Sequence, residues 1–245
     1  MAESKWTNRL SRVSLVLALS ALVIAFTGLT LARYDLVPKL AGFFTLLGGG
    51  AVALGGLITG LIALGLNWKH GTASRRSALV GFILSLAFVA FLGSRPLAAG
   101  GAPALHDITT DLANPPQFRV LVVRSDNLAG VGTLENWRAM HARAYRDLKP
   151  VRISRPVEMV TEDAVRIAKD MGWAIAVSDP ATGHVEATAS VSYIRFQDDV
   201  VIRVTPSVDG KGSIVDMRSV SRIGVGDLGV NARRIRSFLA ALKAP

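Results

Sequence analysis

Six polar side chains near the C-terminus have the types and the spacing of a ligand-binding site. They are Arg218, Ser221, Arg222, Asp227, Asn231 and Arg234. The first three end a strand-like run, a glycine-containing loop follows, and the acid and the amide stand where a helix would begin. Backbone N–H groups at a helix N-terminus attract anions, and arginine donates paired hydrogen bonds to carboxylate or phosphate oxygens. The pattern predicts a binding site that needs no cofactor.

The same residues also have structural interpretations. Asp227 is a natural N-cap for the helix that follows it, and its charge there would repel a bound anion. Asn231 could tie the loop back to a strand. Arg222 and Arg234 are expected at the surface, where loss of an arginine changes the free energy of unfolding by about 0.5 kcal/mol or less.

Alternation along two neighbouring strand-like runs separates their side chains into two faces. Arg203, Asp216 and Arg218 fall on one face, with Arg203 opposite Asp216, and a row of solvent-side ion pairs is expected there. Ser219 and Ser221 fall on the apolar face, toward the helices.

Groups for catalysis are few. Ser219 or Ser221 would need a nearby base to act as a nucleophile, and His184 is the histidine expected near the sheet. Asp198 and Asp199 are adjacent in a predicted turn, and the sequence has no G-x-S-x-G motif. The chain has no cysteine and four widely separated histidines, so no metal site is predicted. A hydrolase or other enzyme acting on an envelope substrate is the alternative to a binding module.

The elements that would position these residues form an α+β domain. Amphipathic helices are predicted over residues 133–148 and 156–171, and a closing helix over 228–242. Four strands are predicted over 173–177, 185–193, 200–205 and 214–222, with a further short strand at 120–123. Turn sequences at 179–183 and 209–212 separate the strands. We expect an antiparallel four-stranded meander packed with about three helices.

Three windows without charged residues precede this domain. They are Val13–Ala32, Leu40–Trp68 and Ser77–Ser94, of 20, 29 and 18 residues. A membrane-spanning helix needs about 20 apolar residues. The sequence therefore predicts a three-helix transmembrane region (1–94), a Pro/Gly-rich tether (95–117) and a soluble α+β domain (118–245). The first window could instead be a cleaved signal peptide, but it exceeds the apolar core of roughly 7–15 residues in such peptides.

Basic residues indicate the orientation of these spans. The chain has nine lysines and arginines against two acids before Gly101, and nineteen against sixteen after it. The basic residues that determine the predicted orientation are Lys5, Arg9 and Arg12 before the first window and Lys69, Arg75 and Arg76 before the third. Basic loops face the cytoplasm, so we expect a multi-pass protein of the bacterial inner membrane with a cytoplasmic N-terminus and a periplasmic C-terminal domain.

Partners follow from the same features. The lipid bilayer is one, and an envelope protein, a lipid head group or a cell-wall component are candidates for the domain. Nucleic acid is not expected, because no strand or helix gathers basic and aromatic residues on one face. Gly56 and Gly60 form a G-x-x-x-G step, which lets helices approach closely. The step would serve either packing within the chain or a homo-oligomer.

Several stretches of the domain are similar to one family. They are HDITTDLANPPQF, AYRDLKPV, Gly172-Trp173, DPATGHVEAT, FQDDVVIRV, VDMRSVSRIG and DLGVNARRIRSFL. With these stretches the chain resembles the domain of unknown function 1499 family from Pro103 to Leu242. Many members carry cysteines early in the domain, and this chain resembles the membrane-anchored branch that lacks them. The resemblance implies no activity, cofactor or substrate.

Overall fold

The computed structural model describes residues 2–70, 74–98 and 100–243, which divide into two compact units. The first unit holds the helices α1 (Ala2–Arg33), α2 (Lys39–His70) and α3 (Arg75–Ala98). The second holds a sheet and three further helices. The domain limits predicted at residues 1 and 245 lie outside the described residues.

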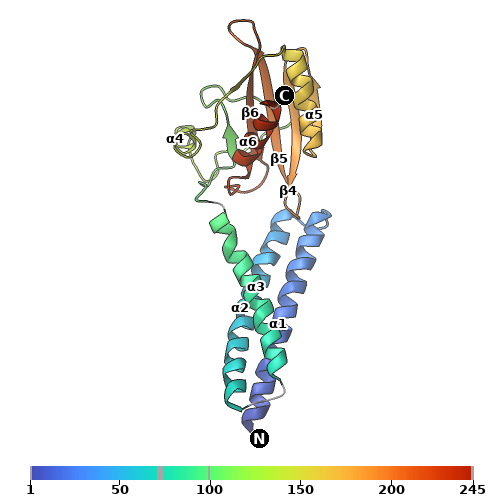
Figure 1. Cartoon of the computed structure of the whole chain (residues 1–245), viewed down its shortest axis with the longest axis vertical. Helices are drawn as coiled ribbons and strands as arrows, with labels where there is room; N and C mark the ends of the chain where they lie inside the picture. The colour runs from blue at the N-terminus through green and yellow to red at the C-terminus, as the bar shows by residue number, and fades with distance from the viewer. Residues whose placement is uncertain (1, 71–73, 99, 244–245) are drawn as a thin grey trace. The chain divides into compact units, whose positions relative to one another are not determined.

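Each helix of the first unit is long and apolar enough to cross a membrane (Figure 1). Large side chains such as Phe26, Phe44 and Ile58 are exposed, whereas small ones such as Ala21 and Ala53 are buried between the helices. Such a distribution is typical of helices that face lipid and pack through small residues. The three apolar helices predicted from the sequence are confirmed.

The glycines of the G-x-x-x-G step pack within the chain. A methyl group on Gly56 would lie 2.5 Å from Ser85 Oγ and 3.3 Å from Ala18 N, and one on Gly60 would lie 2.6 Å from Ser14 Oγ. Ser14 Oγ also donates a hydrogen bond to Gly56 O at 2.9 Å. The space beside both glycines is therefore occupied by α1 and α3 of the same chain. A homo-oligomer through Gly56 and Gly60 stays a prediction.

The second unit is built on a six-stranded antiparallel sheet with strands in the order β1-β6-β5-β4-β3, and β2 also pairs with β6. The strands are β1 (Asp107–Thr109), β2 (Val151–Ile153), β3 (Ala174–Asp179), β4 (His184–Val191), β5 (Phe196–Pro206) and β6 (Ser213–Ser221). The helices are α4 (Leu134–Ala144), α5 (Val157–Asp170) and α6 (Val230–Lys243).

The α+β class is confirmed, and the predicted meander corresponds to β3 through β6. The number of strands was predicted wrongly, because β1 and β2 have three residues each and are too short to show alternation. Both pair with β6, which lies far along the chain. Residues 105–109, placed in the tether by the sequence, include β1 and the buried Leu105 and Ile108.

Two helices cover one face of the sheet. α5 contacts β3, β4 and β5, and α6 contacts β6 and β1. Ile202 and Met217 on the strands and Phe238 on α6 are fully buried between these layers. Trp173 stacks on Phe238 with ring centroids 5.3 Å apart. This helix face therefore contains the main apolar core.

The third helix of the domain, α4, is fixed to the edge strand β1. Trp137 Nε1 donates to Asp107 O at 2.9 Å, and Thr109 N donates to His141 Nε2 at 3.1 Å. Thr133 caps α4 by accepting the N–H of Asn136. Both bonds from α4 reach the backbone of β1, so this helix and this strand hold each other at the sheet edge.

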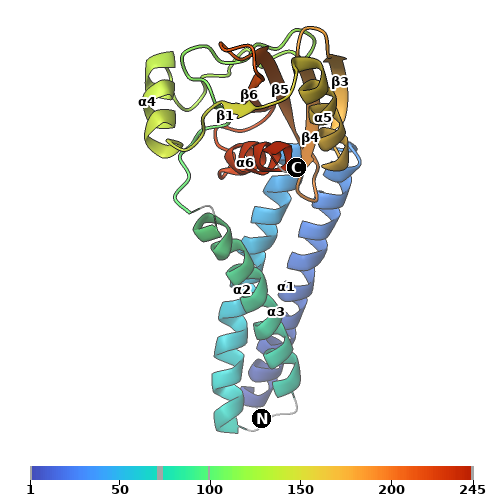
Figure 2. The ribbon, with the colours of Figure 1, turned by 45° about the horizontal axis from the view of Figure 1, so that its top comes forward.

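The opposite face of the sheet is crossed by an irregular segment, residues 111–126, which we call the strap (Figure 2). The short strand predicted at 120–123 is wrong, since these residues form no strand and Val122 is 85% exposed. The physical reason is a different hydrogen-bond partner: backbone N–H groups of the strap donate to the side chain of Glu186 on β4.

Candidate functional site

The sheet separates the six predicted site residues. Alternation along β6 turns Ser219 and Ser221 toward the helices, and it turns Arg218 and Arg222 toward the strap. Asn231 and Arg234 lie on α6 and face the helix side. The structure thus gives two clusters where the sequence suggested one.

On the helix face, Asn231 connects α6 to two other segments. Its Nδ2 donates to Ser221 Oγ at 2.9 Å and to His106 O at 3.0 Å. Its Oδ1 accepts from Ser219 Oγ at 2.7 Å. The predicted link between the loop and a strand is confirmed. The amide nitrogen and oxygen of Asn231, which could have bound a ligand, are both engaged in these hydrogen bonds.

Arg234 belongs to the same buried cluster. Its Nη2 donates to Asp198 Oδ2 at 2.6 Å, and its Nη1 donates to Ser219 Oγ at 2.9 Å and to Asn231 Oδ1. The side chains of Arg234 and Asp198 are 8% and 5% exposed. The surface position expected for Arg234 is wrong. Asp198 lies inside β5 and not in a turn, and alternation along β5 points its side chain toward α6, where it binds Arg234.

Asp227 acts as the cap of α6. It accepts the N–H of Gly229 at 2.8 Å and the N–H of Asn231 at 2.5 Å. The helix begins at Val230, two residues later than predicted, because Leu228 adopts a left-handed φ of 53°. Burial raises the pKa of Asp227, although these N–H bonds lower it. The chain's own carboxylate thus takes the N–H groups that an external anion would use.

The strap face carries the predicted row of ion pairs. Arg203 Nη2 lies 3.1 Å from Asp216 Oδ2 and 3.1 Å from Asp111 Oδ2. Arg218 binds both carboxylate oxygens of Asp107, at 2.9 and 2.7 Å. The Arg203–Asp216 pair is confirmed, but the row is not on the solvent side as predicted, because the strap lies over it.

The charged row also fixes the strap to the sheet. Arg203 donates to Asn114 O at 3.1 Å, and Arg218 donates to Pro116 O at 3.3 Å. The Glu186 carboxylate accepts strap N–H groups. Side chains of the sheet therefore replace the backbone partners that a neighbouring strand would give.

Arg222 lies at the end of the row and is partly open to solvent, with its side chain 41% exposed. Its Nε and Nη2 donate to the two oxygens of Asp199, both at 2.8 Å. Its Nη1 donates to Gln197 Oε1 at 2.5 Å, and Nη2 also reaches Thr188 Oγ1 at 3.1 Å. Hydrogen bonding to Asp199 raises the pKa of Arg222, so the guanidinium stays charged.

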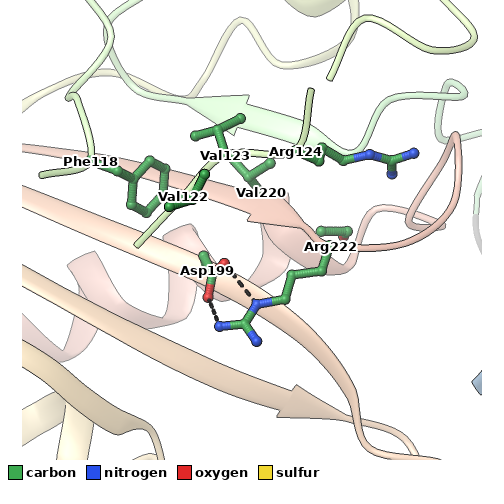
Figure 3. Close-up of a pocket in the computed structure, with 8 residues that line it drawn as sticks. Phe118, Val122, Val123, Arg124, Asp199, Val220 and Arg222 are labelled. Carbon is green, nitrogen blue, oxygen red and sulfur yellow. Dashed lines mark hydrogen bonds and ion pairs between the residues drawn. The ribbon is translucent and has the colours of Figure 1, made fainter. Parts of the chain in front are cut away.

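A pocket of about 210 Å³ opens beside this arginine. Its lining residues are Phe118, Val122, Val123, Arg124, Asp199, Val220, Ser221 and Arg222. Figure 3 shows the strap side chains on one side of the pocket and the Arg222–Asp199 pair on the other. Arg124 is turned toward the next loop, where its Nη1 donates to Gly224 O at 2.6 Å. We call this the Arg222 pocket; its walls are mostly apolar and Arg222 is its polar anchor.

A second hollow of about 260 Å³ is lined by Gln117, Trp137 and the Asp107–Arg218 pair, among others. These two charged side chains are bonded to each other, and the Trp137 N–H is already donated to Asp107 O. Arg138, which also lines this hollow, is exposed, so the Arg222 pocket is distinguished by its more apolar walls.

The geometry does not assemble a serine hydrolase from the residues considered. Ser219 and Ser221 bond to Asn231 on the helix face. His184 lies on the strap face, where its Nε2 is 2.7 Å from Glu186 Oε1. Among the described residues, no group of three or more acids and histidines is placed to hold a metal ion.

Reasoning from the sequence missed Glu186, Asp199 and the strap residues that line the pocket. Asp199 could have been found, because β5 pairs with β6 and puts Asp199 opposite Val220, on the same face as Arg222. Glu186 gives a weaker signal, namely one acid in an alternating strand whose other residues after His184 are small or apolar. The strap has no periodic pattern, so its walls could not be predicted.

A family model described as "Protein of unknown function (DUF1499)" matches residues 107–242. Among curated proteins, none matches the chain. The matched range begins at β1 and ends within α6, so it includes the whole sheet, the strap and the Arg222 pocket.

Proposed function

The chain belongs to the DUF1499 family of proteins of unknown function, and on that premise we propose that it displays a ligand-binding domain at a membrane. The membrane is the bacterial inner membrane, with the N-terminus in the cytoplasm and the α+β domain in the periplasm. Three helices of sufficient length and apolarity support the anchoring. The basic residues before α1 and before α3 support the orientation. The domain begins before the predicted limit of residue 118, because β1 belongs to its sheet, and the chain belongs to the branch without early cysteines.

The ligand is an amphipathic molecule with an oxygen-rich head group, such as the carboxylate or phosphate of a lipid. One observation carries this proposal: a charged, partly exposed guanidinium beside apolar walls. Arg222 makes four hydrogen bonds, and arginine has five N–H groups. One N–H on Nη1 is therefore left for a ligand oxygen, while Phe118, Val122 and Val123 can contact an apolar portion.

The size of the pocket limits what it can enclose. Drug-sized ligands occupy pockets of about 300–1,000 Å³, and the Arg222 pocket measures about 210 Å³. It would hold a head group and the first few carbons, and the rest of the ligand would lie along exposed aliphatic residues such as Val120 and Val122. Binding is favoured over catalysis because neither serine considered lies near His184.

Lipid analysis of the purified full-length chain tests the proposal. Lipids that co-purify in mild detergent would be quantified by mass spectrometry for the wild type, for Arg222→Ala and for Arg152→Ala. Arg152 on β2 is a matched control, since it forms an exposed ion pair with Asp209 in the turn between β5 and β6. We expect Arg222→Ala to lose a lipid species that the control retains. Equal lipid content in all three proteins would contradict the proposal.

A further inference from the structure

The strap depends on one buried acid. The side chain of Glu186 is fully buried on the strap face of β4. Its Oε1 accepts the N–H of Arg119 at 2.5 Å, its Oε2 accepts the N–H of Leu121 at 2.7 Å, and both oxygens lie within 3.2 Å of the N–H of Val120. Three consecutive backbone N–H groups thus converge on one carboxylate, an arrangement that elsewhere binds free anions.

These bonds replace the regular partners that this part of the chain lacks. Residues 111–126 contain no strand or helix among the described positions. A buried N–H without an acceptor is strongly unfavourable, so the carboxylate is what allows residues 119–121 to lie against the sheet. Burial raises the pKa of Glu186, but the N–H groups of Leu121 and Arg119, the His184 ring and the N–H of Val120 together hold it below its usual value.

The anchored residues lie between the walls of the Arg222 pocket. Phe118 precedes them, and Val122 and Val123 follow them. On the upstream side the strap is held by Arg218 at Pro116 O, and on the downstream side by Arg124 at Gly224 O. Glu186 is the one described side chain that bonds to the backbone of the strap between these two points.

We infer that Glu186 is a positioning residue, which holds the strap and thereby the apolar walls of the Arg222 pocket in place. It does not touch the ligand. The inference rests on the proposed function for its consequence, namely ligand binding, but the anchoring itself can be measured without any ligand.

Amide hydrogen exchange of the full-length chain in detergent, read over peptides covering residues 118–123, tests the anchor. In the wild type the amides of residues 119–121 within these peptides should exchange slowly although they belong to no strand or helix. Glu186→Gln should speed their exchange about tenfold or more, because a hydrogen bond to a charged group contributes at least that factor. Exchange in β5 should stay unchanged. Asp147→Asn, which removes an exposed acid paired with Arg236, should leave both regions as in the wild type.

Two results of the exchange experiment would overturn the inference. The first is fast exchange at residues 119–121 in the wild type, a result that does not depend on whether any variant folds. The second is equal acceleration in the strap and in β5 for Glu186→Gln, which would indicate general destabilisation.

Lipid content then separates this inference from the proposed function. If both Glu186→Gln and Arg222→Ala lose the lipid, both ideas are supported. If only Arg222→Ala loses it, the pocket does not depend on the anchor and the inference is wrong. If neither variant loses it, the proposed function is wrong, and the inferred link from Glu186 to binding fails with it.

Discussion

Replacing Arg234 by alanine should destabilise the domain far more than replacing Arg222 by alanine. Arg234 and Asp198 are both nearly inaccessible to water, and Arg234→Ala would leave the Asp198 carboxylate buried without its cation. Breaking a buried pair in this way costs about 3–5 kcal/mol. For a domain of this size, roughly 2–8 °C of melting temperature correspond to 1 kcal/mol, so we expect a fall on the order of 10–20 °C.

Arg222→Ala should behave differently although Arg222 also pairs with an aspartate. Its side chain is 41% exposed, and truncation would widen a pocket through which water can reach Asp199. Exposed pairs contribute about 0–1 kcal/mol, so the melting temperature should fall by a few degrees at most. Thermal melts of the full-length chain in detergent, followed by near-ultraviolet circular dichroism, would compare the two variants. Trp173, stacked on Phe238 of α6, makes this signal sensitive to the loss of α6 packing.

A double variant checks the reason for the difference. Asp198→Leu combined with Arg234→Met removes both charges and keeps similar volumes, and such apolar replacements of buried pairs are often neutral or stabilising. The double variant should therefore melt well above Arg234→Ala. Our reasoning would be refuted if the two single arginine variants melted together, or if the double variant were as unstable as Arg234→Ala.

Three further outcomes are expected. Asp227→Ala should destabilise the domain by about 0.5–2 kcal/mol through loss of the α6 cap, and Asp227→Asn should destabilise it less in the same melts, because it keeps an acceptor. Burial lowers the pKa of His141 to about 4 from 6.5, so the unfolded chain takes up a proton at a higher pH than the folded chain does. The contribution of His141 to the free energy of unfolding should be complete above about pH 6.5 and decline by up to about 3 kcal/mol toward pH 4. His141→Gln should flatten this pH dependence in urea titrations. Reporter fusions at Ala73, outside the described residues, should read cytoplasmic and those after Gly101 exported, and an exported signal at Ala73 would contradict the proposed orientation.

The long apolar helices and the meander were predictable because each has a period that many residues repeat. Alternation through β5 and β6 gave the two faces and the pairing of Arg203 with Asp216. It also gave the contact between the serines and α6. These features depend on local geometry, which a sequence records directly.

The remaining features depend on partners that are distant in the chain. Asp198 and Asp199 are adjacent, yet one binds Arg234 on the helix face and the other binds Arg222 on the strap face. Placing them in a turn hid both pairs. The strap has no period at all, since its N–H groups are satisfied by Glu186, a side chain 65 residues from Leu121. No local pattern announces such a bond.

The position of β6 has a consequence for how the domain is made. This strand pairs with β5 on one side and with β1 and β2 on the other, and 111 residues separate Asp107 from its partner Arg218. Synthesis at about 5–20 residues per second leaves β1 without its neighbour for on the order of 10 s. During this interval Arg218 has not been made, and the hydrated carboxylate of Asp107 opposes nonspecific pairing at the edge of β1, as charged side chains on edge strands do. The carboxylate that binds Arg218 in the finished sheet thus also protects β1 while it waits for β6.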